Sequence, residues 1–359
     1  MLPTGLLFTC RWIHSFCIIK TMTKKLLCFY IICLCFIAGC KKNQSTLTNS
    51  TETVEPSEIV KKTLEANKTG LTVGYIRGIN SLINTFFFEN KIDSKNISFK
   101  MLQFDDKAGL LSALLKNQIN IAVFDIADTQ KINLILPSSL SILCTLGYEN
   151  INLLTTDNTY SSLSSLIDKD VYLCEEGSYI DIFFKSLLKR NSIPCSADDE
   201  AGRVHLKYGI SAAEISGKLY DGKIEYAVLD CVLSGIALSK KSALIKKIDL
   251  LKDYYLLNKN SIAEYVVLTN PSYAKSHPNA VFFYLDKIKE GANWIKDNKN
   301  MTLISCQKNG IFVTKQNAVS AFDNFNLVIE DGENCKKTVN DFLDFCDLEQ
   351  FSPSLFYSF

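Results

Sequence analysis

Four short turns carry the side chains with which this chain could bind a small molecule. In an open parallel sheet, ligands bind beyond the carboxyl ends of the strands, so turns that follow apolar runs are the first candidates for a binding site. These turns are Arg77-Gly78-Ile79-Asn80, Asp125-Ile126-Ala127-Asp128, Gly177-Ser178-Tyr179 and Asp230-Cys231. The candidate ligand-binding residues are Arg77, Gly78, Asn80, Asp125, Gly177, Ser178, Tyr179 and Asp230.

The charged members of this set favour two different kinds of ligand. Arg77 could hold a carboxylate or sulfonate through two parallel hydrogen bonds, or it could form a surface ion pair. Asp125 and Asp230 could accept hydrogen bonds from an amine or a ring nitrogen. An aspartate at the end of a strand is also a routine helix cap. The sequence does not decide between an anionic ligand and a cationic or heterocyclic one.

The turn at Gly177 has its own mechanism for binding. Glycine permits close approach of the backbone, and the N–H groups at the start of a helix attract an anion or another acceptor. Ser178 could equally serve only as the N-cap of that helix. Tyr179 could stack on a planar ligand, or it could pack inside the protein.

The sequence contains no recognisable catalytic motif, because GxSxG, HExxH, Walker and GxGxxG patterns are all absent. After Cys40 the histidines are His205 and His277, which we interpret as structural or surface residues. The cysteines form no CxxC pair, which argues against a zinc site, and we expect neither a metal nor a cofactor. Pairing of Cys335 with Cys346 is left open.

The elements that position the four turns alternate between two patterns. Strand patterns cover 71–76, 97–104, 119–124, 170–174, 224–229 and 263–268, and helical patterns cover 82–88, 108–116, 163–167, 180–188, 211–219 and a long stretch from Pro278. This alternation predicts parallel sheets covered by helices on both faces. The length of 359 residues suits two domains. With 39 basic and 38 acidic residues, the chain has no basic excess that would indicate nucleic-acid binding.

Residues 1–39 contain the pattern of an export signal. Lys24 and Lys25 precede a short apolar run at 26–38, and Gly39-Cys40 follows this run directly. A positive start, a short apolar stretch and small residues define a secretory signal peptide. The run is shorter than the ~20 residues that span a bilayer, although an uncleaved anchor is the alternative. Residues 1–21 precede a complete signal, and we interpret them as the product of an upstream start codon.

Ile37-Ala38-Gly39-Cys40 resembles the bacterial lipobox. The resemblance implies that Cys40 becomes the N-terminus and carries fatty acyl chains such as palmitate, which hold the protein at a membrane. Residues 40–68 are polar and rich in Ser, Thr and Asn, so we expect a lipidated, flexible tether.

Several segments of the remaining chain resemble one protein family. They are Gly74-Tyr75-Ile76-Arg77-Gly78, residues 111–122 (LSALLKNQINIA), Glu176-Gly177-Ser178-Tyr179 and residues 265–281 (YVVLTNPSYAKSHPNAV). In this order they resemble the solute-binding proteins of bacterial ABC importers, in the group that serves nitrate, sulfonates and thiamine precursors. The resemblance covers residues 69–350 and depends on the order of the segments, because no single motif is diagnostic.

The resemblance implies an α/β, periplasmic-binding-protein type II-like fold with two lobes, each a mostly parallel sheet flanked by helices. Crossovers near 148–155 and 254–265 would place residues 69–150 and 262–359 in lobe 1 and residues 151–261 in lobe 2. The ligand would lie between the lobes.

The function that this resemblance implies is the capture of a small solute outside the cytoplasm. The protein would be a monomer, anchored to the cell membrane by lipid on the periplasmic or exterior side, and would deliver its solute to an ABC permease and ATPase. Two alternatives stay open: an enzyme of the same fold resembling those of the menaquinone pathway, and a surface lipoprotein without a transport role.

Overall fold

The computed structural model describes residues 68–358 apart from 93, 149–150, 231–232, 236, 239–244, 259–260 and 312–325. The described residues belong to one compact unit, Val60–Phe359. The predicted signal peptide, the lipidation site Cys40, the tether up to residue 67 and Cys231 lie outside the described residues. None of the helices in the described ranges is both long and apolar enough to cross a bilayer.

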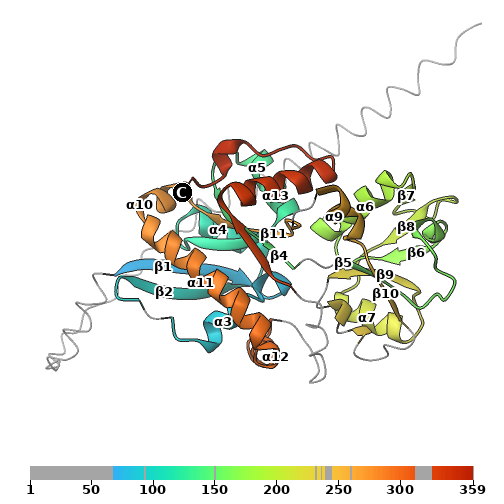
Figure 1. Cartoon of the computed structure of the whole chain (residues 1–359), viewed down its shortest axis with the longest axis horizontal. Coiled ribbons are helices and arrows are strands. Elements are labelled where there is room, and N and C mark those ends of the chain that lie inside the picture. The colour runs from blue at the N-terminus through green and yellow to red at the C-terminus, as the bar shows by residue number, and fades with distance from the viewer. Residues whose placement is uncertain are drawn as a thin grey trace, which may run out of the picture. The chain divides into compact units, whose positions relative to one another are not determined.

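The first sheet contains six strands in the order β12-β4-β11-β3-β1-β2. Figure 1 labels β1, β2, β4 and β11 among them. Their bounds are β1 Thr69–Ile76, β2 Ile97–Phe104, β3 Ile121–Asp125, β4 Ser141–Gly147, β11 Tyr265–Thr269 and β12 Val328–Asp331. Strands β3, β4 and β11 are buried along their whole length. They are central because their apolar side chains alternate between two covered faces of the sheet. We call this sheet and the helices packed on it lobe 1.

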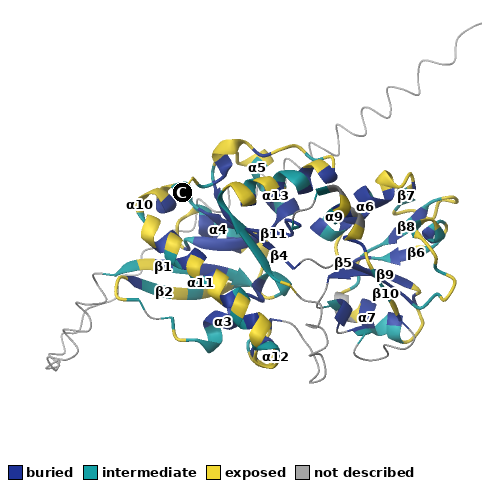
Figure 2. Cartoon of the chain, viewed as in Figure 1, coloured by how far each residue is buried: buried dark blue, intermediate teal, exposed yellow. Residues whose placement is uncertain are grey.

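The helices of lobe 1 flank this sheet. They are η1 Ile79–Ser81, α3 Asn84–Glu89, α4 Lys107–Leu115, α5 Ile126–Ile135, α10 Pro271–Ser276, α11 Pro278–Asp297, α12 Lys299–Lys308, α13 Gly332–Phe345 and η4 Pro353–Leu355. The long helix α11 begins at Pro278, which suits the first helical position because its missing N–H would have no partner there. Figure 2 shows the buried stripe along α11, which includes Val281, Leu285 and Ile288.

The second sheet also contains six strands, in the order β10-β5-β9-β6-β8-β7. Their bounds are β5 Ile151–Thr155, β6 Asp170–Tyr172, β7 Cys195–Ser196, β8 Val204–Lys207, β9 Tyr226–Asp230 and β10 Lys246–Asp249, and the accompanying helices are η2 Leu163–Leu166, α6 Tyr179–Arg190, α7 Ala212–Tyr220 and α9 Lys252–Asn258. We call this sheet and its helices lobe 2.

Strand β9 shows why lobe 2 needs helices on both faces. Tyr226 and Val228 join the large apolar cluster that also contains α6 residues such as Phe183. Ala227 and Leu229, which point to the opposite face, join a separate cluster with α7 residues. Alternation along a strand sends successive side chains to opposite faces, so both faces of β9 are covered.

The predicted two-lobed α/β fold is confirmed, and both sheets are mixed: among the described strands, two of five neighbouring pairs are parallel in the first sheet and three of five in the second. In the first sheet β11 is antiparallel to both β3 and β4, and in the second β5 is antiparallel to β9 and β10. Parallel neighbours arise where a helix carries the chain back across the same sheet. The chain enters β5 from the first sheet and reaches β11 after the second sheet, so neither strand follows such a crossover.

The strands of the first sheet come from 69–147 and 265–331, and those of the second come from 151–249. The lobe boundaries at 150/151 and 261/262 stay a proposal. The predicted helix at 163–167 is a short 3-10 turn, and the one at 82–88 forms as α3 after η1.

The suggested pairing of Cys335 with Cys346 does not occur, because both cysteines are free and buried. Cys335 lies in the first turn of α13, and Cys346 is the C-cap of the same helix. Eleven residues along a helix separate two Cα atoms by about 16 Å, whereas a disulfide needs less than about 7 Å.

Candidate functional site

A cavity of about 250 Å³ lies where elements of both sheets meet. All of the predicted ligand-binding residues except Gly177 line it, namely Arg77, Gly78, Asn80, Asp125, Ser178, Tyr179 and Asp230. Three of the turns follow the carboxyl ends of β1, β3 and β9, and the fourth precedes α6. The structure thus brings the four predicted turns together around one cavity.

The turn after β1 requires a glycine. Gly78 has φ 146° and ψ −179°, a backbone conformation that essentially only glycine adopts. Ser81 fixes the turn, because its Oγ donates to the carbonyl oxygens of Ile76 (2.8 Å) and Gly78 (2.9 Å). Arg77 is exposed, and its guanidinium lies so close to Gly310 that a Cβ there would be 3.3 Å from Cζ.

Asp125 ends the buried strand β3 and caps α5. Its Oδ1 accepts from the backbone N–H of Ala127 (2.7 Å) and of Asp128 (3.3 Å). Its Oδ2 accepts from the backbone N–H of Tyr179 in lobe 2, at 3.2 Å. The carboxylate therefore joins the first turns of two helices that belong to different lobes.

Burial raises the pKa of Asp125 to about 6, and the neighbouring Asp128 carboxylate acts in the same direction. The hydrogen bonds from Tyr179 and Ala127 and the charge of Lys107 oppose the rise in this pKa, but they are weaker than desolvation. Asp125 therefore titrates close to neutral pH.

The turn before α6 has the cap geometry that the sequence allowed. Gly177 has φ 73°, and its N–H donates to Asp181 Oδ2 at 2.7 Å. Ser178 is the N-cap, and its side chain accepts from the N–H of Asp181. Tyr179 is 2% exposed, so its ring packs in the protein. Its hydroxyl donates to Glu264 Oε2 at 3.3 Å.

Asp230 ends β9 in the same way that Asp125 ends β3. The two strands read Ile121-Ala-Val-Phe-Asp125 and Tyr226-Ala-Val-Leu-Asp230, and both are fully buried. Asp230 Oδ1 accepts from the N–H of Leu233 at 2.8 Å. Asp125 is thus the helix cap that the sequence offered as one alternative, Asp230 makes the corresponding contact with an N–H three residues later, and both line the cavity.

Further charged or aromatic residues belong to the surroundings of the cavity but were not among the candidate ligand-binding residues, although one predicted turn included Asp128. Lys107, Asp128 and Tyr265 line it, and Glu264, with no exposed surface, accepts from Tyr179. A glutamate inside the apolar run 262–268 is a signal that the sequence did offer, because buried carboxylates usually have a specific partner. Lys107 gave no such signal, since its partners lie far away in the chain.

Lys107 and Lys131 link lobe 1 to the turn before α6. Lys107 Nζ lies 2.5 Å from Asp128 Oδ2 and 3.3 Å from Glu175 Oε1. Lys131 Nζ donates to the carbonyl oxygen of Gly177 at 2.9 Å. Both lysine side chains are about half exposed, so each contact is worth little by itself.

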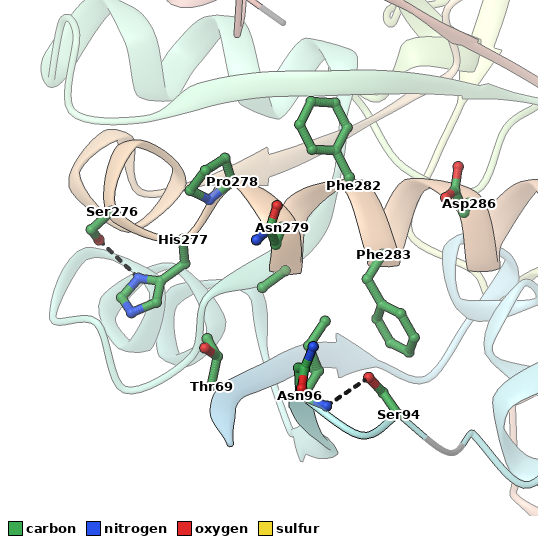
Figure 3. A pocket seen from close by; sticks show the side chains of 12 residues that line it. Thr69, Ser94, Asn96, Ser276, His277, Pro278, Asn279, Phe282, Phe283 and Asp286 are labelled. Carbon is green, nitrogen blue, oxygen red and sulfur yellow. Dashed lines mark hydrogen bonds between the residues drawn. The ribbon is translucent and has the colours of Figure 1, made fainter. Parts of the chain in front are cut away.

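A second cavity, of about 450 Å³, lies within lobe 1 (Figure 3). It is lined by Thr69 and Ile97, which begin β1 and β2, and by the start of α11. His277 lies at its edge, with Nδ1 2.8 Å from Ser276 Oγ. This cavity is at the amino ends of parallel strands, opposite to the end where such sheets bind ligands.

His205 has a structural environment, as the sequence indicated. Its Nδ1 lies 3.3 Å from Asp170 Oδ1 and its Nε2 lies 3.0 Å from the carbonyl oxygen of Glu200. Asp170, Asp199 and His205 are close enough to share a metal ion. The ammonium group of Lys207 already pairs with Asp199 and lies 3.7 Å from Asp170, so a cation of the chain itself occupies this position.

Known structures of similar shape share the fold. An ABC transporter structure from Parabacteroides distasonis aligns with 81% of this chain and 99% of its own, at 18% identity and TM-score 0.63. The periplasmic aliphatic sulphonate-binding protein SsuA from Escherichia coli aligns with 79% of this chain and 89% of its own, at 12% identity and TM-score 0.60.

The description of a third structure names the fold. A Candida albicans protein described as exhibiting the generic periplasmic binding protein structural fold aligns with 80% of this chain and 93% of its own, at 11% identity and TM-score 0.51. No family model and no curated protein matches the sequence. The two six-stranded sheets, the cavity where they meet and these structural matches identify the fold of this chain as that of the periplasmic binding proteins.

Proposed function

We propose that this chain is the extracytoplasmic solute-binding lipoprotein of an ABC importer. It captures a small solute in the cavity between the lobes and delivers it to a permease and its ATPase. The observation that carries this proposal is the position of the cavity, at the carboxyl ends of strands from both sheets, with turns of both lobes in its lining. A ligand that contacts both lobes stabilises their closed arrangement by the difference in its affinity for the two states.

Binding without catalysis is the simpler use of this site. Within the described chain, neither His205 nor His277 lines the cavity, and Asp125 holds two helix starts with its two oxygens. A general base has to be within hydrogen-bond reach of its substrate, and Asp125 would have to give up a helix contact to act as one. We therefore propose a binding protein rather than an enzyme of the menaquinone-pathway type.

The solute itself provides the test of this function. The full chain is purified without added ligand and denatured, and the released small molecules are identified by mass spectrometry. We expect one solute to be present at close to one per protein in the wild type and to be reduced in at least one of Arg77→Ala and Asp230→Ala. Asp221→Ala, which changes an exposed ion pair with Lys223, is the matched control. The absence of any captured solute from the wild type purified from its native host would contradict the proposal.

The anchor is tested separately from the cavity. Cys40 follows Ala38-Gly39 in the sequence, and we propose that it carries the acyl chains that keep a monomeric protein at the membrane. Cells fed radiolabelled palmitate should label the wild type and should leave Cys40→Ser unlabelled and unprocessed. Labelling of the Cys40→Ser variant, or recovery of the wild type with an intact leader in the cytosol, would contradict this part of the proposal.

A further inference from the structure

Carboxylates outnumber cations in the described lining of the cavity between the lobes. The acidic side chains are Asp125, Asp128, Glu175 and Asp230, and the basic ones are Arg77 and Lys107. Glu264 adds a further carboxyl group directly behind Tyr179. A solute in this space therefore enters a region where its own charge decides whether it is attracted or repelled.

The helix starts that could attract an anion are already occupied by carboxylates of the chain. Asp125 caps α5 with one oxygen and accepts from Tyr179, the first residue of α6, with the other. Asp181 accepts from the N–H of Gly177, just before α6. Asp230 accepts from the N–H of Leu233 after β9. An anionic solute would have to displace one of these carboxylates to use the donors that they bind.

The two basic side chains in the lining do not offset the excess of carboxylates. Lys107 is shared between Asp128, at 2.5 Å, and Glu175, at 3.3 Å. Arg77 lines the cavity but is exposed and lies against Gly310. The attraction of an exposed guanidinium for an anion is screened by the surrounding solvent.

Two largely buried tyrosines, Tyr179 and Tyr265, lie in the lining of the cavity together with Asp125. The Tyr265 ring lies edge-on to the rings of Tyr179, at 5.2 Å, and Tyr148, at 5.7 Å. Tyr179 and Tyr265 line the cavity together with Asp125 and Asp230. Aromatic rings beside carboxylates are the combination that binds an organic cation, because the ring faces and the carboxylates are both negative.

We infer that this cavity selects a small solute with a protonated amine or another N–H-donating cationic head group, and that it excludes sulfonates and carboxylates. This inference rests on the proposed function, because it assigns the charge of the solute that the same cavity captures. It separates the chain from the sulphonate-binding protein of the same fold, in spite of the shared architecture.

Three probes with the same ring test the inference: benzylammonium, benzyl alcohol and benzenesulfonate. Their binding to the purified full chain is measured by calorimetry and by thermal shift at pH 7.5. We expect benzylammonium to bind roughly tenfold or more tightly than benzenesulfonate, with benzyl alcohol between them, because like charges across an interface are strongly disfavoured. Equal binding of the three probes, absence of binding by all of them, or a preference for benzenesulfonate would overturn the inference.

Two substitutions remove one negative charge each without removing a helix cap or a core side chain. Asp230→Asn keeps an oxygen that can accept from the N–H of Leu233, and Glu175→Gln changes a side chain that is 63% exposed. Both should lower the ratio of the affinities for benzylammonium and benzenesulfonate, by roughly tenfold for Asp230→Asn and by less for Glu175→Gln. Asp221→Asn should leave this ratio unchanged. An unchanged preference in Asp230→Asn and Glu175→Gln would overturn the assignment.

The two proposals fail in different ways. If the protein releases a native solute on denaturation but that solute is an anion, the function as a solute-binding protein holds and the inferred charge selection is wrong. If the probes bind with the expected order but no native solute is found with the wild type, the charge selection of the cavity holds and the transport role is contradicted.

Discussion

Helix α6 contacts lobe 1 at both of its ends, and the two ends do so with different chemistry. At its N-terminal end the contacts are polar: the N–H of Tyr179 donates to Asp125 at 3.2 Å, and Lys131 donates to the carbonyl oxygen of Gly177 at 2.9 Å. Further along the helix Phe183 stacks on Phe345 of α13, with ring centroids 5.2 Å apart, and the contacts with Phe345 continue to the C-terminal residue Arg190. Arg190 lies over the same ring at 4.6 Å.

Under the proposed function, the difference predicts which end moves when a solute enters. The contacts at Asp125 adjoin the cavity and depend on a carboxylate whose pKa is about 6. The contacts at Phe345 involve buried rings and two backbone carbonyls that accept from Arg190, and neither depends on the solute. Packed interfaces repack only in discrete steps, so we expect the Phe345 end to act as the pivot and the Asp125 end to open.

The largest predicted effect is at the pivot. Phe345 is 3% exposed and contacts the rings of Phe183 and Tyr254, so Phe345→Ala should lower the free energy of unfolding by about 3–5 kcal/mol. Phe282→Ala, at a position that is 43% exposed, is the control and should cost much less. Urea denaturation followed by tryptophan fluorescence measures both. Similar losses in the two variants would show that the α6–α13 contact is not a packed pivot.

The next effect depends on pH and concerns the opposite end. The pKa of Asp125 is raised from 3.8 to about 6 in the folded protein, so the folded state binds this proton more tightly than the unfolded state. Its contribution to stability is therefore complete below pH 4 and is lost as the pH rises through 6, by at most about 3 kcal/mol.

Asp125→Asn isolates this contribution, because asparagine keeps the cap on α5 but does not titrate. The difference in Tm between wild type and Asp125→Asn should change between pH 4 and pH 6 and stay constant from pH 7 to pH 8. The variant should also hold the two lobes together less tightly. The side-chain amide of asparagine has an NH2 group in place of one carboxylate oxygen, and this group cannot accept from the N–H of Tyr179. Parallel pH profiles for the two proteins would mean that Asp125 does not titrate in this range.

A smaller effect is expected at Arg190. Its Nε and Nη2 donate to the carbonyl oxygens of Phe345 (2.9 Å) and Asp344 (3.0 Å), a pair of bonds that the single ammonium group of lysine cannot reproduce. Arg190→Lys should lower the free energy of unfolding by about 1 kcal/mol. Arg203→Lys, which changes an ion pair with Glu200 on the surface, should have almost no effect. If Arg190→Lys and Arg203→Lys lose the same free energy of unfolding in urea, the contacts of Arg190 do not hold the C-terminal end of α6 more firmly than a surface ion pair would.

The local parts of this arrangement were predictable from the sequence. Apolar runs that end in Asp125 and Asp230 indicated buried strands followed by helix starts, and the rule for strand ends placed both aspartates near one cavity. The start of helix α6 after Ser178 was equally predictable, because Ser178 is followed by an apolar stripe that contains Phe183, Phe184 and Leu187.

The contacts between the lobes were not predictable, because nothing local encodes them. The partner of Asp125 Oδ2 lies 54 residues away, at Tyr179, and Arg190 finds its acceptors 154 and 155 residues away. Such pairs depend on how two lobes meet, whereas periodicity reports only which side of one element is buried. The mixed direction of the strands was missed for the same reason, since it follows from the two passages of the chain between the sheets.

Lys107 should give the smallest effect, and it tests how much the N-terminal end of α6 contributes by itself. Lys107 bridges Asp128 of lobe 1 and Glu175 of lobe 2, but the lysine and the glutamate are 48% and 63% exposed. Solvent and the entropy of long side chains offset most of such an interaction. Lys107→Met should therefore change the free energy of unfolding by no more than about 0.5 kcal/mol, and less still at about 1 M salt, where charges are screened within 3 Å. A loss of about 2 kcal/mol that salt does not reduce would mean that this end is held as firmly as the Phe345 end, and α6 would then have no preferred pivot.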